Sequence, residues 1–293
     1  MSDNPLISVV LPVRYVNYDW LRKSIESVLT QTYKNLELIV VNDESTQPID
    51  DLITEYGIKK YVINERNMKL PYSLNRGFEK AEGMYHTWTS ADNYMLPGML
   101  ERLAKELDDN SQIGIITGRS YDLKRNGEIV DSLPTEKLIS EISKTEYGTR
   151  YIPRKLVFYS TLGACFLYRK EVFEKINGYD VSLHGREDYD FWIRASSYFK
   201  IARLDYSEPP YYVYRLHDNS ISHSTPYCFT KGRYEVLKKE SKLDVQNAEL
   251  REALNFFRLK VRREIKRNNK IFKTMSRLFN LIKKLWMKLP SRN

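Results

Sequence analysis

Asp92 and the adjacent pair Glu187 and Asp188 are the residues whose positions most favour chemistry. Asp92 follows an apolar run, residues 84–88, that is typical of a strand, and open α/β sheets bind ligands at the carboxyl ends of their strands. Glu187 and Asp188 fall at the first turn of a helix with an aromatic face. Each position also has a structural explanation, because Asp-Asn pairs form turns and acidic residues interact favourably with a helix N-terminus.

Asp43 and Ser45 belong to a second polar loop, which follows the β-branched apolar run of residues 36–41. A carboxylate in such a loop is able to accept a hydrogen bond from the imide N–H of a uracil-type base or from a ribose hydroxyl. The structural alternative is an Asx turn that caps a helix beginning near Ile49. The composition of the loop alone does not separate the two interpretations.

Alternating strands and helices are expected to position these loops. Residues 6–11 form a β-branched apolar run ended by Pro12, and the apolar residues after Asp19, a candidate N-cap, fall at helical spacing. Ser73 opens another helical pattern. Further strands are predicted at 36–41, 60–64, 84–88, 113–117, 200–204 and 211–215, and a hairpin is predicted to close at Asn126-Gly127. The alternation predicts an α/β fold with a mostly parallel sheet flanked by helices.

Several of these segments resemble the family 2 glycosyltransferases. Residues 27–33 read Ser-Val-Leu-x-Gln-Thr-Tyr and residues 41–46 read Val-x-Asp-x-Ser-Thr, and both motifs are specific. The other matching segments are 8–14, 90–93 with Pro97, 163–180, 186–194 and 215–222. The resemblance covers residues 5–222 and implies a GT-A (Rossmann-like) α/β domain followed by a helical tail.

The resemblance implies a metal site at the Asp92 loop. The second Asp of the family's Asp-x-Asp loop holds a divalent metal against the nucleotide diphosphate, and Asp92 stands at that position. Ser90 and Ala91 occupy neighbouring positions of the loop, so one carboxylate remains of the usual two or three. His217 matches the histidine that reaches the metal or the diphosphate. Because Mg²⁺ often takes only one or two carboxylates when phosphates supply further oxygens, Mn²⁺ or Mg²⁺ is the expected cofactor.

The resemblance also implies where the nucleotide binds. The loop after the first strand, together with Asp43, is expected to hold the base and ribose. Arg76 is expected to approach the diphosphate, with exposed helix surface as the alternative. Glu44 and Lys69 depart from the family, because each stands where a Gly is usual. The expected nucleotide-binding residues are Pro12, Val13, Arg14, Tyr15, Asp43, Ser45, Asn67, Arg76, Ser90, Ala91 and Asp92.

Within the resemblance, the pair Glu187 and Asp188 supplies the catalytic base. Sugar transfer to a hydroxyl needs a carboxylate that takes the proton as the glycosidic bond forms. We expect Asp188 to be the base and Glu187 to orient the acceptor, and the sequence allows the two roles to be exchanged. A single base favours direct displacement with inversion. The expected reaction moves a sugar from a nucleotide diphosphate sugar, with UDP preferred, to a hydroxyl of a saccharide or lipid-linked saccharide.

The positive charge of the chain is concentrated at its C-terminal end. The net charge is +9, and residues 251–293 hold 14 Lys and Arg against Glu252 and Glu264, so residues 1–250 carry −3. Apolar and aromatic residues recur at helical spacing through residues 261–289 between basic residues. This pattern predicts a helix that lies on an anionic membrane surface, and packing on the domain or on a second copy is the alternative.

The expected organisation is a catalytic domain at residues 1–225, with a nucleotide-binding half (1–121) and an acceptor half (122–225), and a basic helical extension at residues 226–293. The chain has no run of 18 apolar residues and its N-terminus lacks the features of a signal peptide. With only two cysteines, Cys165 and Cys228, a cytoplasmic protein is expected, peripheral at the inner face of the cell membrane.

Two functions of other classes compete with this prediction. A catalytically weak or inactive sugar-nucleotide-binding module is suggested by Ser90 and Ala91 in the expected metal loop. Nucleic-acid binding through the basic tail would predict a steep salt dependence, but the chain has no recognisable reading motif, so no nucleic-acid partner is expected.

Overall fold

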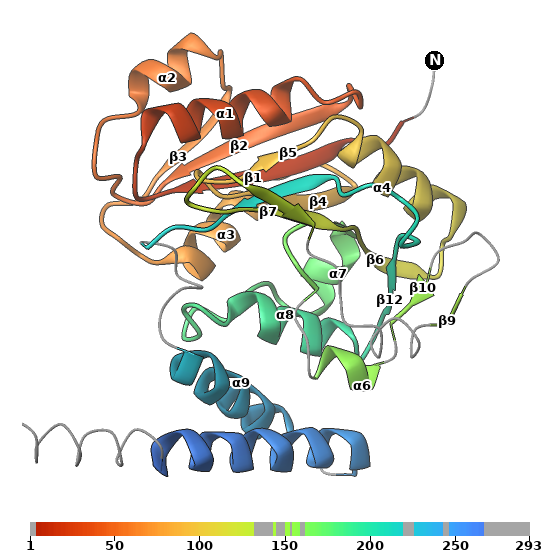
Figure 1. Ribbon diagram of the computed structural model, residues 1–293. Coiled ribbons are helices and arrows are strands. Elements are labelled where there is room, and N and C mark those ends of the chain that lie inside the picture. The colour runs from red at the N-terminus through yellow and green to blue at the C-terminus, as the bar shows by residue number, and fades with distance from the viewer. Residues whose placement is uncertain are drawn as a thin grey trace, which may run out of the picture. The chain divides into compact units, whose positions relative to one another are not determined.

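The computed structural model describes residues 4–131, 143–144, 150–152, 154–158, 162–218, 226–242 and 246–266 (Figure 1). The chain divides into two compact units, Met1–His223 and Ser224–Asn293. The boundary at residue 225 and the inner division at residue 121, both expected from the sequence, stay predictions.

Nine of the described strands form one sheet, in the order β3-β2-β1-β4-β11-β6-β12-β10-β9. Their bounds are β1 Ile7–Val13, β2 Leu36–Asn42, β3 Lys60–Ile63, β4 Tyr85–Trp88, β6 Ile113–Thr117, β9 Ser143–Lys144, β10 Arg150–Tyr151, β11 Phe166–Arg169 and β12 Lys200–Arg203. β3, β2, β1 and β4 are parallel neighbours, and β6 and β12 are parallel to each other. β11 is antiparallel to both β4 and β6, and β10 is antiparallel to both β12 and β9, so the other seven strands share one direction. The predicted mostly parallel sheet is confirmed.

Helices pack on both faces of this sheet in the described part of the chain. Val9 and Leu11 of β1 belong to the same buried cluster as Leu21 of α1. Gly77 of α3 instead lies against Val10, whose Cγ1 would be 2.5 Å from a Cβ added at the glycine. Because side chains alternate across a strand, α1 and α3 cover opposite faces. The bounds in this unit are α1 Tyr18–Leu29, α2 Asp50–Glu55, α3 Leu70–Phe78, α4 Met99–Asp109, α6 Arg154–Val157, α7 Lys170–Lys175 and α8 Glu187–Ala195.

β1 continues through Pro12, which the sequence predicted would end it. β4 pairs with β1 only as far as Val10, and the Thr89 N–H donates to the Val10 carbonyl at 3.0 Å. Pro12 faces the same side as Val10 but lies beyond the last residue of β4. Its missing N–H therefore breaks no bond of the ladder.

Two helix starts differ from the prediction. Asn17, rather than Asp19, caps α1, because the Asn17 side-chain oxygen accepts a hydrogen bond from the Trp20 N–H at 3.1 Å. α3 begins at Leu70, before the predicted start at Ser73, and has a proline in its first turn, where proline costs no helical hydrogen bond.

A second sheet has the order β5-β13-β7-β8. Its strands are β5 Tyr94–Met95, β7 Ser120–Leu123, β8 Ile129–Asp131 and β13 Tyr212–Arg215. β7 and β8 form the predicted hairpin, with Gly127 at φ +82° in its turn. The antiparallel pairing of β5 with β13 was not predicted, because a two-residue strand has no periodicity to detect. This pairing brings the Asp92 loop beside the chain that follows β13.

The second unit contains α9 (Pro226–Glu240) and a further helix over residues 248–266. Val236 and Leu237 of α9 are buried, as are Leu250, Ala253 and Phe257 of the further helix. Within the described residues no helix combines the length and apolar character needed to cross a bilayer. Most of the predicted membrane-surface segment, residues 267–289, lies outside the described residues.

Candidate active site

The Asp92 loop is held in place by side chains of α1. Ser24 Oγ donates to the Ser90 carbonyl at 3.0 Å, and Ser27 Oγ accepts from the Met95 N–H at 3.1 Å. Gln31 bridges the same segment, since its Nε2 donates to the Leu96 carbonyl at 2.9 Å and its Oε1 accepts from the Leu100 N–H at 3.1 Å. Ser27, in α1, and Gln31, just after α1, are the polar residues of the Ser-Val-Leu-x-Gln motif. The motif therefore supports the Asp92 loop and the start of α4.

β13 approaches the Asp92 loop from the other side and brings His217 to it. The Arg215 N–H donates to Asn93 Oδ1 at 2.8 Å, and Arg215 Nε donates to the Asp92 carbonyl at 3.0 Å. Two residues on, His217 Nε2 lies 2.7 Å from Asp92 Oδ2. The structure therefore brings together the two residues that the sequence suggested as metal ligands.

The Asp92 and His217 pair has the donor set that a divalent metal needs. Asp92 Oδ1 is buried and has no hydrogen-bond partner in the part of the chain that is described, although its other oxygen contacts the imidazole. The described residues contain no cluster of three or more His, Cys, Asp or Glu able to hold a metal. Diphosphate oxygens would have to complete the coordination, as is usual for Mg²⁺ and Mn²⁺ at nucleotides. The residues present fit such an ion.

Ser90 and Ala91 have contacts within the chain that differ from those of the Asp92 and His217 pair. Ser90 Oγ accepts a hydrogen bond from Asn93 Nδ2 at 2.6 Å, and Ala91 is half-buried against the hydrophobic core. These two residues shape the loop, and their predicted contact with the donor stays a prediction.

Asp43, on the nucleotide side, has both carboxylate oxygens engaged by the chain itself. Oδ1 accepts from Asn64 Nδ2 at 2.8 Å and from the Met68 N–H at 2.7 Å, while Oδ2 accepts from the Lys69 N–H at 3.0 Å. Asp43 is 3% exposed. A carboxylate can accept about four hydrogen bonds, so one more acceptor position remains for a base or ribose. The nucleotide contact of Asp43 stays a prediction, and the structure adds a structural role, because Asp43 holds the 67–69 turn.

The Asp43 hydrogen bonds stabilise a strained backbone. Lys69 has φ +74° and ψ +161°, and Glu44 has φ +56°, both in regions that favour glycine. These are the two positions where the sequence has a side chain in place of the family's usual Gly. Such strain costs about 1–3 kcal/mol per residue and persists only where the surroundings enforce it. Both residues therefore adopt backbone conformations that glycine adopts without strain.

The loop after β1 lies beside the loop after β2, as predicted. The Asp43 N–H donates to the Val13 carbonyl at 2.9 Å, and the Thr46 N–H donates to the Arg14 carbonyl at 2.8 Å. Arg14 also forms an ion pair with Glu44 at 3.6 Å. Tyr15 is 68% exposed and has an open aromatic face at this edge of the sheet. Its position is suited to stacking on a nucleotide base.

The remaining predicted nucleotide residues have local partners. Ser45 Oγ donates to the Gln47 carbonyl at 2.8 Å, and the Ser45 N–H donates to Asn42 Oδ1, so the Asx turn uses Asn42 rather than Asp43. α2 begins after Ile49 with no side-chain cap, so Ser45 does not cap it. Asn67 Oδ1 accepts from the Lys69 N–H at 3.1 Å.

Arg76 is connected to Asp43 through Asn64. Its Nη1 donates to the Ile63 carbonyl and to Asn64 Oδ1, each at 3.0 Å, and Asn64 in turn donates to Asp43. The guanidinium therefore supports the nucleotide loop through Asn64. A direct approach of Arg76 to the diphosphate stays a prediction.

The acidic pair stands at the start of α8, as the sequence predicted. Glu187 is 4% exposed, and burial, followed by the negative charge of Asp188, raises its pKa to about 7. Glu187 Oε2 accepts from the Arg186 N–H at 3.0 Å, and Asp188 Oδ1 accepts from the Tyr189 N–H at 2.6 Å. A carboxyl group that titrates near neutrality is suited to take and release a proton at physiological pH.

Residues that the sequence analysis missed connect this pair to the rest of the site. Asn75 of α3 makes two hydrogen bonds of 2.8 Å to the backbone of Tyr179, in the loop that leads to Glu187. Tyr179 Oη accepts from Trp88 Nε1 at 3.0 Å, and Trp88 ends the strand before the Asp92 loop. Burial raises the pKa of Tyr179, with smaller contributions from the charges of Asp188 and Glu187, which lie nearby. No sequence signal identifies the Trp88 and Tyr179 contact.

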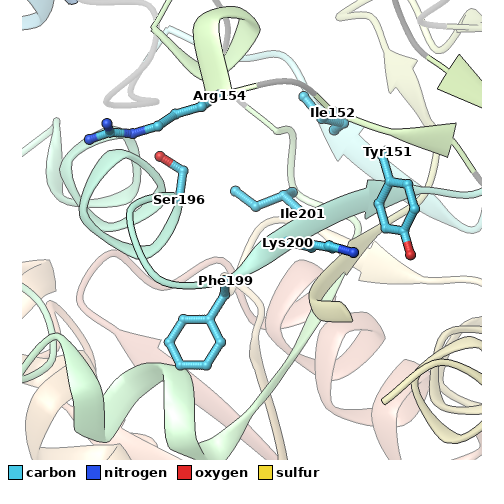
Figure 2. Close-up of a pocket in the computed structure, with 7 residues that line it drawn as sticks. All are labelled: Tyr151, Ile152, Arg154, Ser196, Phe199, Lys200 and Ile201. Carbon is cyan, nitrogen blue, oxygen red and sulfur yellow. The ribbon is translucent and has the colours of Figure 1, made fainter. Parts of the chain in front are cut away.

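A pocket of about 360 Å³ lies elsewhere in this unit. Its lining comes from β10, α6, the end of α8 and the start of β12, as Figure 2 shows. Lys200 begins β12 and pairs with Ile113 at the start of β6, so the pocket lies at the amino edge of the sheet. The Asp92 loop follows the carboxyl end of β4. The pocket is therefore separate from the candidate site.

Comparison with known proteins identifies the family. Residues 8–177, more than half of the chain, match the sequence profile of Glycosyl transferase family 2. The uncharacterized glycosyltransferase RP339 of Rickettsia prowazekii is 28% identical over 217 residues, which are 73% of this chain and 65% of that protein. The chain thus spans less than two thirds of the length of this relative.

Solved structures show the same fold at low identity. The crystal structure of S. aureus TarS 1-349 in complex with UDP-GlcNAc has a TM-score of 0.67 and 19% identity, and covers 86% of this chain and 71% of that one. The crystal structure of GalNAc-T7 with UDP, GalNAc and Mn²⁺ has a TM-score of 0.60 and 15% identity, and covers 81% and 48%. The predicted GT-A fold is confirmed, and the profile match shows that the chain belongs to glycosyl transferase family 2.

Proposed function

We propose that the chain transfers a sugar from a UDP-sugar to a hydroxyl of a saccharide or lipid-linked saccharide, with assistance from a divalent metal and with inversion at the transferred carbon. The observation that carries the proposal is the Asp92 and His217 pair at the carboxyl edge of the sheet, in which a buried Asp92 oxygen has no partner among the described residues. Support also comes from neighbours of the same fold that were crystallised with UDP-GlcNAc or with UDP and Mn²⁺.

The residues of the chain divide the work of this reaction. Asp92 and His217 would hold Mn²⁺ or Mg²⁺, which neutralises charge on the leaving diphosphate. Asp43 and the exposed ring of Tyr15 are placed to receive the nucleoside. The Glu187 and Asp188 pair takes the proton of the acceptor hydroxyl as the new bond to the sugar carbon forms and the bond to the diphosphate breaks. A base that activates the acceptor directly gives inversion.

The competing hypothesis is a sugar-nucleotide-binding module with little or no activity. It is motivated by Ser90 and Ala91, which stand where the family has further acidic residues. The raised pKa of Glu187 favours an enzyme, because a binding module gains nothing from a buried carboxyl group that titrates near neutrality.

A donor panel tests the proposed function. The full chain is incubated with UDP-, GDP- and dTDP-sugars in Mn²⁺, in Mg²⁺ and in EDTA, and nucleotide diphosphate release is measured with and without saccharide acceptors. Metal-dependent release from a UDP-sugar is the expected result. Binding of UDP-sugars without turnover under every condition would favour the inactive module, and no binding of any nucleotide sugar would overturn both.

We also propose that the C-terminal segment attaches the enzyme to an anionic membrane surface. In the described part of this segment, Phe256 and Leu259 are exposed on the same side of a helix whose exposed residues include Arg262, Arg263 and Lys266. Each basic residue near anionic lipid contributes about 1 kcal/mol, and exposed apolar side chains insert at the interface. Such attachment would bring the active site to lipid-linked acceptors.

A further inference from the structure

Arg215 is a positively charged group at the candidate site that has no carboxylate partner among the described residues. Its Nε donates to the main-chain oxygen of Asp92 at 3.0 Å, and no hydrogen bond from its two terminal nitrogens is found in the described part of the chain. Two other arginines at this edge have more contacts within the chain: Arg14 pairs with Glu44, and Arg76 Nη1 donates to both the Ile63 carbonyl and Asn64 Oδ1.

We propose that Arg215, held by Trp20, binds the diphosphate of the donor. This inference rests on the proposed function, because it assumes a nucleotide diphosphate at the Asp92 site. It assigns to Arg215 the contact that the sequence suggested for Arg76, whose Nη1 donates to the Ile63 carbonyl and to Asn64 Oδ1.

Trp20 gives the guanidinium a fixed orientation. The Arg215 Cζ lies 4.6 Å from the centre of the Trp20 ring, and the His217 ring centre lies 5.1 Å from the same ring. Trp20 is itself placed by the cap of α1, where its N–H donates to Asn17. With one face on the indole and Nε bound to Asp92, the guanidinium keeps its terminal N–H groups for a ligand. Arginine suits this task because its planar donors match two phosphate oxygens at once.

The charge of the loop explains why a guanidinium is useful here. Asp92 is the single acidic residue in the stretch 90–93, so a metal at this site is held by one carboxylate and one imidazole. Metal affinity falls with fewer charged ligands. An arginine a few ångströms from Asp92 would share the diphosphate charge with the metal, and would retain part of the diphosphate affinity when no metal is bound.

Calorimetric titration with UDP and with uridine tests the proposal without any sugar donor or turnover. Uridine shares the base and ribose but lacks the phosphates, so the ratio of the two affinities isolates the diphosphate contact. In EDTA, the wild-type chain is expected to bind UDP about 10- to 100-fold more tightly than uridine, which is the range for a charge-assisted hydrogen bond to phosphate. R215Q is expected to lose this preference and to keep its uridine affinity.

Matched variants separate the diphosphate contact from a structural role. R215K keeps the positive charge but lacks the planar pair of donor nitrogens, and is expected to keep part of the preference for UDP over uridine. R22Q removes another arginine from the region, one that binds Glu55 on the outside of α1, and is expected to change neither affinity. If R215Q also loses affinity for uridine, the substitution has affected the fold. Trp20→Leu then provides the test, because it removes the stacked ring but leaves the hydrogen bond from Arg215 to Asp92. It is expected to lower the ratio of UDP affinity to uridine affinity in EDTA.

The outcomes distinguish this proposal from the proposed function. A wild-type chain that binds UDP in Mn²⁺ while R215Q shows the same UDP-to-uridine ratio in EDTA overturns the role of Arg215 alone. Equal wild-type affinities for UDP and uridine in EDTA also overturn it. A wild-type chain that does not bind UDP even in Mn²⁺ overturns the UDP-sugar proposal, and this inference with it.

Discussion

Three acidic residues of the candidate site differ in chemistry because their surroundings differ. Asp43 accepts three hydrogen bonds from the chain and organises a turn. Asp92 keeps a buried oxygen that has no partner in the described part of the chain, and its other oxygen contacts an imidazole, which suits a metal ligand. Glu187 is buried beside Asp188, which raises its pKa to about 7 and suits proton transfer. All three side chains carry a carboxyl group, and the partners of each carboxyl group decide its role.

The acidic pair predicts a pH dependence of turnover. A general base must be deprotonated, and the raised pKa of Glu187 means that Glu187 still holds a proton below about pH 7. If Glu187 is the base, kcat is expected to fall as the pH drops below about 7. Glu187→Gln removes the neighbouring charge, so the acidic limb of the profile should move to lower pH if Asp188 is the base. The measurement is kcat for donor and acceptor between pH 5 and 9.

The same pair of variants assigns the base. Asp188→Asn is expected to lower kcat by about 10²- to 10⁴-fold with little change in donor affinity, since general base catalysis acts in the transition state. Should Asp188→Asn keep full activity while Glu187→Gln loses it, the two roles would be exchanged.

At the scale of elements, the sequence predicted most strands and helices but not the contacts between distant loops. The strand at Ile113–Thr117 and the hairpin at Gly127 are local patterns, and both were predicted. The pairing of β5 with β13 brings together Asp92 and His217, which are 125 positions apart in the sequence. Neither short strand has a sequence pattern that identifies the strand it pairs with. The resemblance supplied these two residues as ligands, whereas Trp20, Arg215 and Asn75 needed the structure.

Lys69 shows why a boundary was missed. The sequence gives no reason for a lysine at φ +74°, and three hydrogen bonds to Asp43 enforce it and start α3 early. Lys69→Gly relieves the strain but makes the unfolded chain more flexible, so a net stabilisation of about 1 kcal/mol is expected. Urea unfolding measures it, with the exposed Lys80→Gly as a control that should destabilise or leave stability unchanged. A loss of stability in Lys69→Gly would show that the backbone is not strained.

His86 in β4 is a buried titratable residue that is expected to affect the pH dependence of folding stability rather than catalysis. It is 1% exposed among Phe78, Tyr168 and Phe173, and burial, then the charge of Lys170, lowers its pKa to about 4, while Glu37 acts in the opposite direction.

The unfolded chain therefore binds a proton at His86 between about pH 6.5 and 4 that the folded chain does not. The contribution of neutral His86 is complete above about pH 6.5 and is lost as the pH falls toward 4, by about 3 kcal/mol in total. His86→Phe is expected to flatten this part of the dependence, whatever its effect at neutral pH. Urea unfolding of both chains from pH 4 to 7 is the test, and parallel pH curves would refute it.

At the scale of the whole chain, charge separates the two units in sequence. Residues 224–250 hold five Lys and Arg against four Asp and Glu, so the unit Met1–His223 carries −4 and the unit Ser224–Asn293 carries +13. An acidic catalytic unit is repelled from an anionic membrane, so a basic extension is a physical means of keeping it there. The charge distribution thus predicts attachment of the chain to an anionic surface.

Liposome flotation tests the membrane attachment. The full chain is expected to float with anionic liposomes and not with neutral ones, and to be released by high salt, because the electrostatic part is screened. A chain truncated after Asn247, which removes Phe256, Leu259 and the basic residues that follow them, is expected to lose this binding. Recovery of the full chain in the lipid-free fraction with both kinds of liposome would reject the proposal.

The central claim is that Asp92 holds a metal for donor turnover, and Asp92→Asn tests it most directly. The amide keeps the shape of the side chain but removes the charge that a hard cation requires. Donor turnover by wild type and variant is measured across a Mn²⁺ titration, with thermal unfolding as the check of the fold. We expect Asp92→Asn to remain folded and to lose turnover at every Mn²⁺ concentration. A folded variant with wild-type turnover and the same Mn²⁺ dependence would contradict the account.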